Sequence, residues 1–434
     1  MQSTSSPRAS RGLFVAVALL AWAPGALGAI TCSVKTIELP DAFAGQQLLV
    51  SENGTDVTRD ATYASTDAKV AKVDAKGYVT PVSDGTARVQ ITRGADKLEL
   101  PVTVKGFGAA ARGVDFRTEV MPLLSKHGCN AGGCHGKASG QNGFKLSLFG
   151  FDTAFDYEAI AKEARGRRLF PANPGQSLFL LKGAGRVPHG GGNRLPAGTA
   201  DYEVLHRWIA AGAPASAPDA PKVTGLKVRP ADAIMRDGQR QQLAVIAEYS
   251  DGSQRDVTRQ SEFFSNLDVV AGVDADALVK AGKESGEAAV MARHMGFVAV
   301  FKAIKPHGPP LQAIPDFKPA NKIDELALEK WKKLGLKPSP PCDDATFIRR
   351  ATVDVCGRLP TATEVTAFLA DASAGKRAAL IDKLLDSSDY AAYFAMKWGA
   401  VLRNSRLAGA DEAAVAFHNW LKDKIARDRP YDEF

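Results

Sequence analysis

Two stretches of the chain alternate apolar and polar residues in the manner of β-strands. In the first stretch, apolar side chains occupy every second position at Ala87, Val89 and Ile91. The run that follows has apolar residues at Leu98, Leu100, Val102 and Val104. A period of two places these side chains on one face of a strand, which is the face that packs into a core. Because Gly, Asp and Asn separate such runs, we expect short strands joined by turns and arranged as β-sandwiches.

This pattern occurs twice in the chain. The sequence DVTRDATYASTDAKVAKVD begins at Asp56, and DVTRQSEFFSNLDVVAGVD begins at Asp256, an offset of 200 residues. Both copies keep Asp-Val-Thr-Arg, a serine, Val-Ala and Val-Asp. Internal similarity of this kind indicates two copies of one structural unit. We therefore expect one all-β sandwich over residues 29–105 and a second over residues 222–305.

The segment between the two copies has the periodicity of helices. Stretches rich in small residues or proline, at 106–113 and 213–222, bound it as linkers. Its first helix places Phe116, Val120, Leu123 and Leu124 on one face, and its last helix does the same with Tyr202, Leu205, Trp208 and Ile209. An apolar face on each helix predicts packing against a neighbour. We expect an all-α domain over residues 113–215 in which these two helices pack together.

The last part of the chain is helical from Ile323 onward. Apolar stripes at helical spacing run through it, and Thr361 with Glu364 is expected to form a capping box at the start of one helix. We expect an all-α domain over residues 321–434 that is truncated at RPYDEF, either because the sequence is a fragment or because a partner domain has been lost.

Two groups of side chains in this helical part are interpreted as structural. Cys342 and Cys356 are interpreted as a local disulfide, with buried thiols as the alternative. An ion-pair network that braces the helices is expected from the charged residues Asp343, Asp344, Arg349, Arg350 and Asp354, with a polar site as the alternative.

The N-terminus predicts export from the cytoplasm. Arg8 and Arg11 precede an apolar run, and an Ala-x-Gly site follows at 26–28. This is the layout of a secretory signal peptide, which we place at residues 1–28. The apolar run is short for a bilayer span, and Pro24 with Gly25 interrupts it. We therefore expect the mature protein in the periplasm or at the cell surface, without a membrane span.

The charge of the chain argues against one class of partner. The whole chain carries +7, and removal of Arg8 and Arg11 with the signal peptide leaves 7 − 2 = +5. Acidic and basic residues are intermixed, and the tightest basic cluster, KEARGRR at 162–168, is short. Nucleic-acid binding normally requires a basic stripe or groove. We expect no nucleic-acid partner.

The stretch SKHGCNAGGCHGKASG carries the candidate chemistry. Cys129 and Cys134 stand in a glycine-rich segment, and His135 follows the second cysteine directly. Covalent haem attachment uses two thiols and an adjacent imidazole that reaches the iron. The usual spacing has two residues between the cysteines, whereas here there are four, of which Gly132 and Gly133 allow the chain to loop out. A Cys129–Cys134 disulfide is the alternative in an exported protein.

The chain offers histidine rather than methionine as a second iron ligand. No methionine occurs between Met121 and Met235, so the ligand of mitochondrial-type cytochromes is missing. His189, within VPHGGGNRLPAG, stands just before the last helix of the segment and is our candidate for the distal side of the iron. His127 is the competing candidate and is interpreted as helix-end surface, whereas His206 is interpreted as structural.

Three segments resemble known families. VTRDATYASTDAKVAKVDAKGYVTPVSDGTARVQI resembles the bacterial immunoglobulin-like domain of group 2, and the second copy is a looser match. EVMPLLSKHGCNAGGCHGKASG, with PHGGGNRL and LHRWIAAGAP, resembles the planctomycete-type cytochrome C domain. CDDATFIRRATVDVCGRLPTATEVTAFLAD resembles a planctomycete domain of unknown function that commonly accompanies it. The second resemblance implies haem c and electron transfer, with Cys129 and Cys134 attaching the ring and His135 as proximal ligand.

Together these features favour an exported c-type haem protein that transfers electrons to an unidentified redox partner or senses redox state. The alternative is a haem-free cell-surface protein whose sandwiches bind glycan or protein and whose Cys129 and Cys134 form a disulfide. A third hypothesis, an enzyme that uses the helical C-terminal part on polysaccharide, rests on association alone. We find no nucleophile paired with a base in that part of the sequence.

Overall fold

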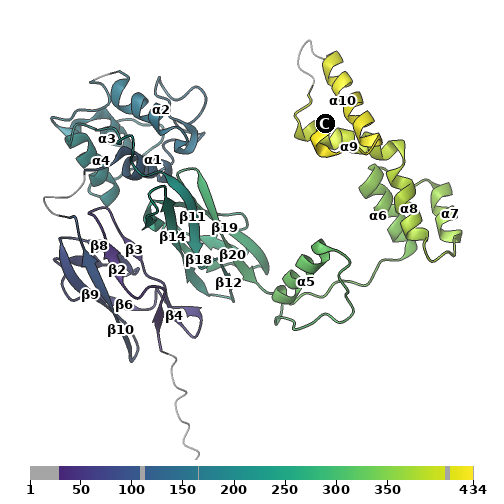
Figure 1. Cartoon of the computed structure of the whole chain (residues 1–434), viewed down its shortest axis with the longest axis horizontal. Helices are drawn as coiled ribbons and strands as arrows, with labels where there is room; N and C mark the ends of the chain where they lie inside the picture. The colour runs from purple at the N-terminus through teal and green to yellow at the C-terminus, as the bar shows by residue number, and fades with distance from the viewer. Residues whose placement is uncertain (1–28, 108–112, 165, 406–410, 434) are drawn as a thin grey trace, which may run out of the picture. The chain divides into compact units, whose positions relative to one another are not determined.

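The fold is given by a computed structural model (Figure 1). It describes residues 29–107, 113–164, 166–405 and 411–433. These form two compact units, of which the first ends at Leu336 and the second begins at Lys337. The expected signal peptide, residues 1–28, lies outside the described residues. Within the described ranges, no helix has the length and apolar character needed to cross a bilayer.

The first unit begins with a β-sandwich of short strands. They are β1 (Thr31–Cys32), β2 (Ile37–Leu39), β3 (Gln46–Gln47), β4 (Val50–Glu52), β5 (Thr55–Asp56), β6 (Thr62–Ser65), β7 (Ala71–Val73), β8 (Tyr78–Pro81), β9 (Gly85–Arg93) and β10 (Asp96–Val104). The sheet orders are β1-β4-β5, β2-β10-β9-β6 and β3-β8-β7. In the β9–β10 hairpin, Leu100 lies opposite Val89 and Val102 opposite Ala87. All four side chains are buried, which confirms the alternation predicted for these strands.

The second sandwich repeats the first strand by strand. Its strands are β11 (Val223–Arg229), β12 (Asp232–Ile234), β13 (Arg240–Gln242), β14 (Ala244–Tyr249), β15 (Gln254–Asp256), β16 (Glu262–Ser265), β17 (Ala271–Val273), β18 (Leu278–Ala281), β19 (Gly286–His294) and β20 (Phe297–Lys305). The sheet orders are β11-β14-β15, β12-β20-β19-β16 and β13-β18-β17, which match those of the first sandwich. The sequence repeat is therefore a repeat of topology.

Between the sandwiches lies a segment of short helices and long loops. Its helices are a π-turn at Phe116–Val120, α1 (Met121–Lys126), a 3₁₀ turn at Leu148–Gly150, α2 (Thr153–Tyr157), a π-turn at Glu158–Lys162, a 3₁₀ turn at Pro174–Gln176, α3 (Leu178–Gly183) and α4 (Ala200–Ala210). Every residue of the two predicted apolar faces is buried. The rings of Phe116 and Trp208 lie 5.4 Å apart, so the first and last helices pack together as expected. The stretches 127–147 and 184–199 contain no helix.

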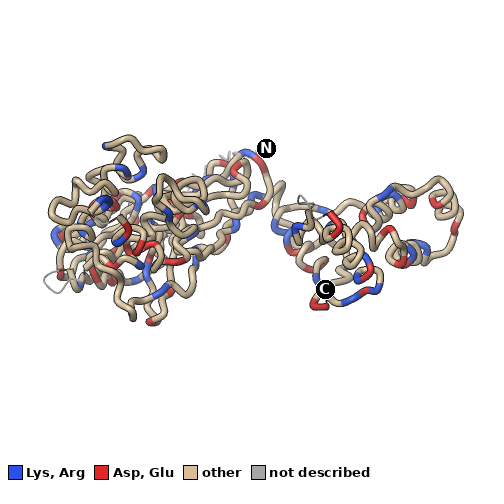
Figure 2. Tube along the Cα trace, turned by 90° about the horizontal axis from the view of Figure 1, so that it is seen from above, with Lys and Arg blue, Asp and Glu red and all other residues tan. Residues whose placement is uncertain are grey.

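The rest of the chain is helical. Helix α5 (Lys322–Leu334) ends at Gly335, whose φ of 68° is the left-handed conformation that favours glycine. The second unit consists of α6 (Asp344–Cys356), α7 (Ala362–Ala370), α8 (Lys376–Leu385), α9 (Ser388–Val401), α10 (Asp411–Ala426) and a 3₁₀ turn at Tyr431–Glu433. The domain expected over 321–434 is thus divided by the unit boundary, because α5 belongs to the first unit. Acidic and basic residues are interspersed along both units (Figure 2).

Candidate functional site

A hollow of about 740 Å³ opens inside the helical segment. This volume is in the range of sites that hold a small molecule or a cofactor. Its walls are mainly apolar and come from α1, α3, α4 and the two long loops, with Leu123, Leu124, Phe144, Leu146, Phe179, Leu195 and Leu205 among them. The four predicted site residues Cys129, Cys134, His135 and His189 all line it. No residue of either sandwich is among those that line it.

The cysteine loop folds back on itself directly after α1. The backbone N–H of Cys129 donates to Leu124 O at 2.8 Å, and that of His135 donates to Cys129 O at 3.0 Å. Both cysteines line the hollow although four residues separate them. Gly136 closes the loop at a point where a Cβ atom would lie 1.9 Å from Asn130 O. A side chain at this position would force the loop open, so the Cys-His-Gly order has a steric reason.

His135 and His189 face each other across the hollow with nearly parallel rings. Their ring centroids are 6.4 Å apart and the planes differ by 11°. His135 uses Nδ1 on Phe144 O at 2.9 Å, and His189 uses Nδ1 on Gly192 O at 3.0 Å. In both rings Nδ1 therefore carries the proton, and Nε2 has no hydrogen-bond partner among the described residues. A backbone carbonyl on one ring nitrogen is the arrangement that orients the other nitrogen toward a metal.

Burial shifts the pKa of Cys129 and of His135. It raises the pKa of Cys129 to about 11, with a further contribution from Cys134. It lowers the pKa of His135, against the raising effect of the hydrogen bond to Phe144, so the imidazole is neutral at neutral pH. Cys129 and Cys134 are free thiols here, and the alternative Cys129–Cys134 disulfide is not formed.

The rim of the hollow is basic, and this cluster of positive charge was not predicted from the sequence. Arg167, Arg168, Lys182 and Arg194 line it, and no Asp or Glu is among its described lining residues. Lys182 donates to Pro188 O at 2.8 Å and Arg194 to Gly191 O at 2.7 Å, so both bind the loop that carries His189. Arg168 lies over the Phe144 ring at 4.7 Å. These four residues span 28 positions of the sequence, from 167 to 194. The fold brings them together around one opening.

The other two histidines of the segment are engaged elsewhere. His127 caps the C-terminus of α1 and its Nε2 lies 2.8 Å from Asp201 Oδ2. Lys126 binds the same carboxylate at 2.8 Å. Burial works to raise the pKa of Asp201, but the interactions of His127 and Lys126 with its carboxylate outweigh burial and hold the pKa below its usual value. His206 stacks on Tyr202 and does not line the hollow, which agrees with a structural role.

The polar side chains of the second unit do not form the cluster considered from the sequence. Asp343 caps α6 by accepting from Thr346 N, and Asp344 pairs with Lys376 and Arg377. The remaining three, Arg349, Arg350 and Asp354, are exposed on α6. The ion-pair interpretation therefore holds for Asp344 but joins it to residues of α8 that were not predicted.

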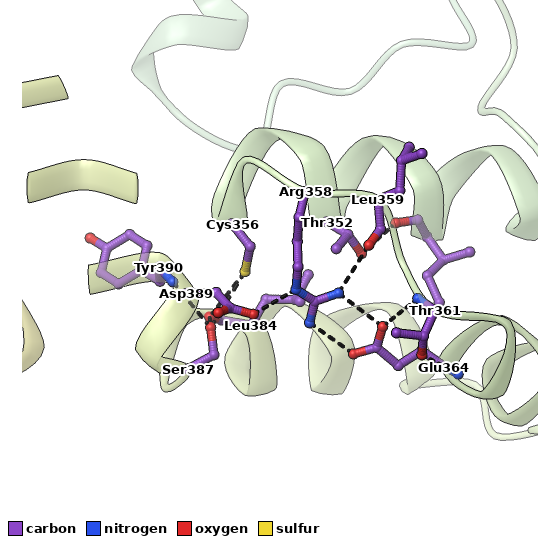
Figure 3. A network of polar contacts seen from close by, with 11 residues as sticks. Thr352, Cys356, Arg358, Leu359, Thr361, Glu364, Leu384, Ser387, Asp389 and Tyr390 are labelled. Atoms are coloured by element: carbon purple, nitrogen blue, oxygen red, sulfur yellow. Dashed lines mark hydrogen bonds and ion pairs between the residues drawn. The ribbon is translucent and has the colours of Figure 1, made fainter. Parts of the chain in front are cut away.

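A second network in this unit centres on Arg358 (Figure 3). Its guanidinium donates two hydrogen bonds to Glu364, at 3.0 and 2.9 Å, and one to Asp389 at 2.5 Å. Glu364 also accepts from Thr361 N at 2.7 Å, and the predicted capping box is confirmed. The network joins the end of α6 to the starts of α7 and α9. These contacts tie the three helices together.

The expected disulfide between Cys342 and Cys356 is wrong. Both are free thiols. The Cys356 sulfur is buried against Leu384 O at 3.7 Å and Ser387 Oγ at 3.4 Å, so it packs against α8 and the start of α9. Among the described residues there is also no group of three or more His, Cys, Asp or Glu side chains that could hold a bare metal ion.

Two segments match known families. Residues 322–434 match the family described as "Protein of unknown function (DUF1549)", and residues 59–106 match the bacterial Ig-like domain. The chain therefore carries these two kinds of domain, in agreement with two of the three resemblances. Neither match covers residues 113–215. No curated protein matches the chain.

Among solved structures, the chain is similar to S-layer proteins at low scores. Domains 5–6 of the S-layer protein SbsC align at 10% identity and a TM-score of 0.25, with 64% of this chain and 98% of that chain covered. Domains 1–6 of the surface layer protein SbsC align at 13% identity and a TM-score of 0.18, and the chain spans 28% of that structure. Likeness at this level says nothing about function.

Proposed function

We propose that the segment 113–215 binds haem c and that the protein is an exported electron-transfer or redox-sensing protein. The observation that carries the proposal is the pair of parallel imidazoles, His135 and His189, whose Nε2 atoms are left open in a hollow that two free cysteines also line. A bound haem c supplies one-electron oxidation and reduction at its iron.

The residues present fit this group in shape and in chemistry. Cys129 and Cys134 would attach the ring through thioether bonds, with His135 and His189 at the two faces of the iron. The apolar walls suit the faces of a porphyrin, and the basic rim of Arg168, Lys182 and Arg194 suits its carboxylates. The hydrogen bonds to Phe144 O and Gly192 O hold both rings in the tautomer that leaves Nε2 available.

The other domains have supporting roles in this proposal. The sandwiches contribute no side chain to the hollow. The second unit contributes ion pairs that join its helices. We therefore assign the chemistry to the helical segment and expect a separate redox partner, which the protein meets in the periplasm or at the cell surface.

Covalent haem is tested on the full chain produced together with a cytochrome c maturation system. The expected protein keeps haem through acid–acetone extraction and gives a pyridine haemochrome spectrum of the c type. The double variant Cys129→Ala/Cys134→Ala should lose this haem, whereas the matched control Cys342→Ala/Cys356→Ala should keep it. Wild-type protein that carries no covalent haem under these conditions would reject the proposal in favour of a haem-free surface protein.

A further inference from the structure

The repeated Asp-Val-Thr-Arg motif takes no part in the proposed haem site. Both copies lie where the two sandwiches touch. Asp56 of the first copy accepts a hydrogen bond from Gln242 N at 2.8 Å, and Asp256 of the second copy accepts one from Gln47 N at 2.7 Å. Each motif therefore binds the backbone of the other sandwich, and the two bonds are reciprocal.

The internal geometry of the two motifs is the same. Thr58 Oγ1 accepts from Val50 N and Thr258 Oγ1 accepts from Val245 N, each at 2.8 Å. Each threonine also binds its own aspartate through Oδ1, which leaves Oδ2 for the partner sandwich. The same residues from both copies thus meet at one contact, as in an interface with approximate two-fold symmetry.

The arginines of the motif add to this contact from both sides. Arg59 donates to Gln242 Oε1 at 2.7 Å and to Asp276 O at 3.3 Å. Arg259 pairs with Asp74 and lies 4.2 Å from the centroid of the Tyr78 ring. Together with Asp56 and Asp256 they place four ionisable side chains of the repeat on the shared surface.

The symmetry is broken where two equivalent residues of the repeat meet. Lys76 forms an ion pair with Asp276, and these two residues are equivalent in the repeat because the offset of 200 still holds at β8 and β18. A residue that meets its own counterpart lies on the approximate axis. Both side chains are partly exposed, at 43% and 39%. Asp60 and Arg240 form a second ion pair, whereas the counterpart of Asp60 is Gln260.

We propose that this contact is a recognition surface on which the first sandwich accepts the second sandwich of the same chain, and that Lys76 and Asp276 determine this choice. In a pair of two first sandwiches Lys76 would face Lys76, and in a pair of two second sandwiches Asp276 would face Asp276. Like charges at the same point oppose both homotypic pairs, while opposite charges favour the heterotypic one. The repeated motif therefore supplies the contact that both sandwiches share. The Lys76–Asp276 pair supplies the charges that disfavour pairing of two identical sandwiches.

The pairing also has a consequence for the segment between the sandwiches. The second sandwich reaches that segment through Arg255, which lies 3.6 Å from Glu119, and through Arg293, whose guanidinium lies 3.7 Å from the centroid of the Phe149 ring. The inserted segment is linked to the first sandwich at one end and to the second sandwich at the other. When the sandwiches pair, both ends of the segment are held by the same pair of domains. The contact between the sandwiches is the same whether or not the segment holds haem.

A charge-reversal cycle on the full chain tests the proposal. Hydrogen–deuterium exchange reports on the amides of Gln47 and Gln242, which donate across the contact. Lys76→Asp and Asp276→Lys should each speed exchange at both amides by about tenfold, because an attraction becomes a repulsion. The double reversal should restore wild-type protection. Lys69→Asp makes the same charge change at an exposed turn of the first sandwich and should leave both amides unchanged.

Three results would overturn the proposal. Unchanged protection in both single variants, or a double reversal that fails to recover it, would show that the axial pair does not determine pairing. Light scattering on the wild-type chain should give a monomer mass at all concentrations, since the partner is in the same chain. A dimer that dissociates on Lys76→Asp would instead assign the contact to sandwiches of two different copies.

Discussion

Single hydrogen bonds leave different ring nitrogens open in the two candidate distal histidines. His189 and His127 are the same residue type, and both line the hollow. His189 engages only Nδ1, on Gly192 O, whereas His127 engages Nε2 on Asp201. Asp201 lies 74 positions from His127 in the sequence, so no local pattern could have revealed this competition. The sequence supplied the candidates, and the geometry favours His189.

His189 is therefore the variant that tests the distal ligand. In haem-loaded protein, His189→Ala should give a high-spin iron. His189→Met should keep a low-spin iron and raise the reduction potential by about 0.1 V or more, within the range of about 0.8 V that axial ligands span. Optical spectra and a potentiometric titration measure both effects.

The control for this pair is His206→Ala, which should change neither the spin state nor the potential because His206 does not line the hollow. A low-spin spectrum that persists in His189→Ala would eliminate His189. His127→Ala would then be the next variant, since His127 is the remaining histidine of the segment that borders the site.

Elements that the sequence predicted well are those whose signal is local. The alternation of β9 and β10, the helix faces of Phe116 and Trp208, and the Thr361 capping box all depend on residues a few positions apart. The features that could not be predicted are contacts between different helices, strands or loops. Cys356 has a cysteine nearby in sequence, yet its thiol packs against α8, so the inferred disulfide was wrong. The basic rim and the contact between the sandwiches were missed for the same reason.

The Arg358 network predicts how acid should affect the second unit. Arg358 lowers the pKa of Glu364 to about 2, with help from the backbone N–H of Thr361. A carboxyl whose pKa is depressed by folding stabilises the fold above its unfolded pKa, and that contribution is lost as the pH falls. Stability from Glu364 should thus be complete above about pH 4.5 and should disappear toward pH 2.

Glu364→Gln isolates this contribution, because glutamine can still complete a capping box. Since Glu364 is near the surface, the variant should lose about 1 kcal/mol or less at pH 7. It should also lose less stability than wild type between pH 4.5 and 2. Urea unfolding followed by circular dichroism measures both. Glu412→Gln, at an exposed position in the first turn of α10, should behave as wild type, and an equal acid response in Glu364→Gln would contradict the assignment.

At the scale of the whole first unit, the hollow and the core that supports it have different extents. All residues that line the hollow belong to the helical segment. Its hydrophobic core, however, continues into the sandwiches, where Phe43 of the first and Met295 of the second pack against it. Arg293 covers Phe149 from the second sandwich. The geometry of ligand binding should therefore depend on the helical segment alone. The stability of that segment should also depend on the two sandwiches that pack against it.

A fragment of residues 113–215 separates these two contributions. It should bind haem with the spectrum of the full chain, because no wall of the hollow is removed. It should unfold several degrees lower, since its core loses the contacts of Phe43 and Met295. In the full chain, Met295→Ala should lower the unfolding midpoint in the same direction and leave the spectrum unchanged. A fragment or a Met295→Ala protein with an altered low-spin spectrum would mean that the sandwiches shape the site itself.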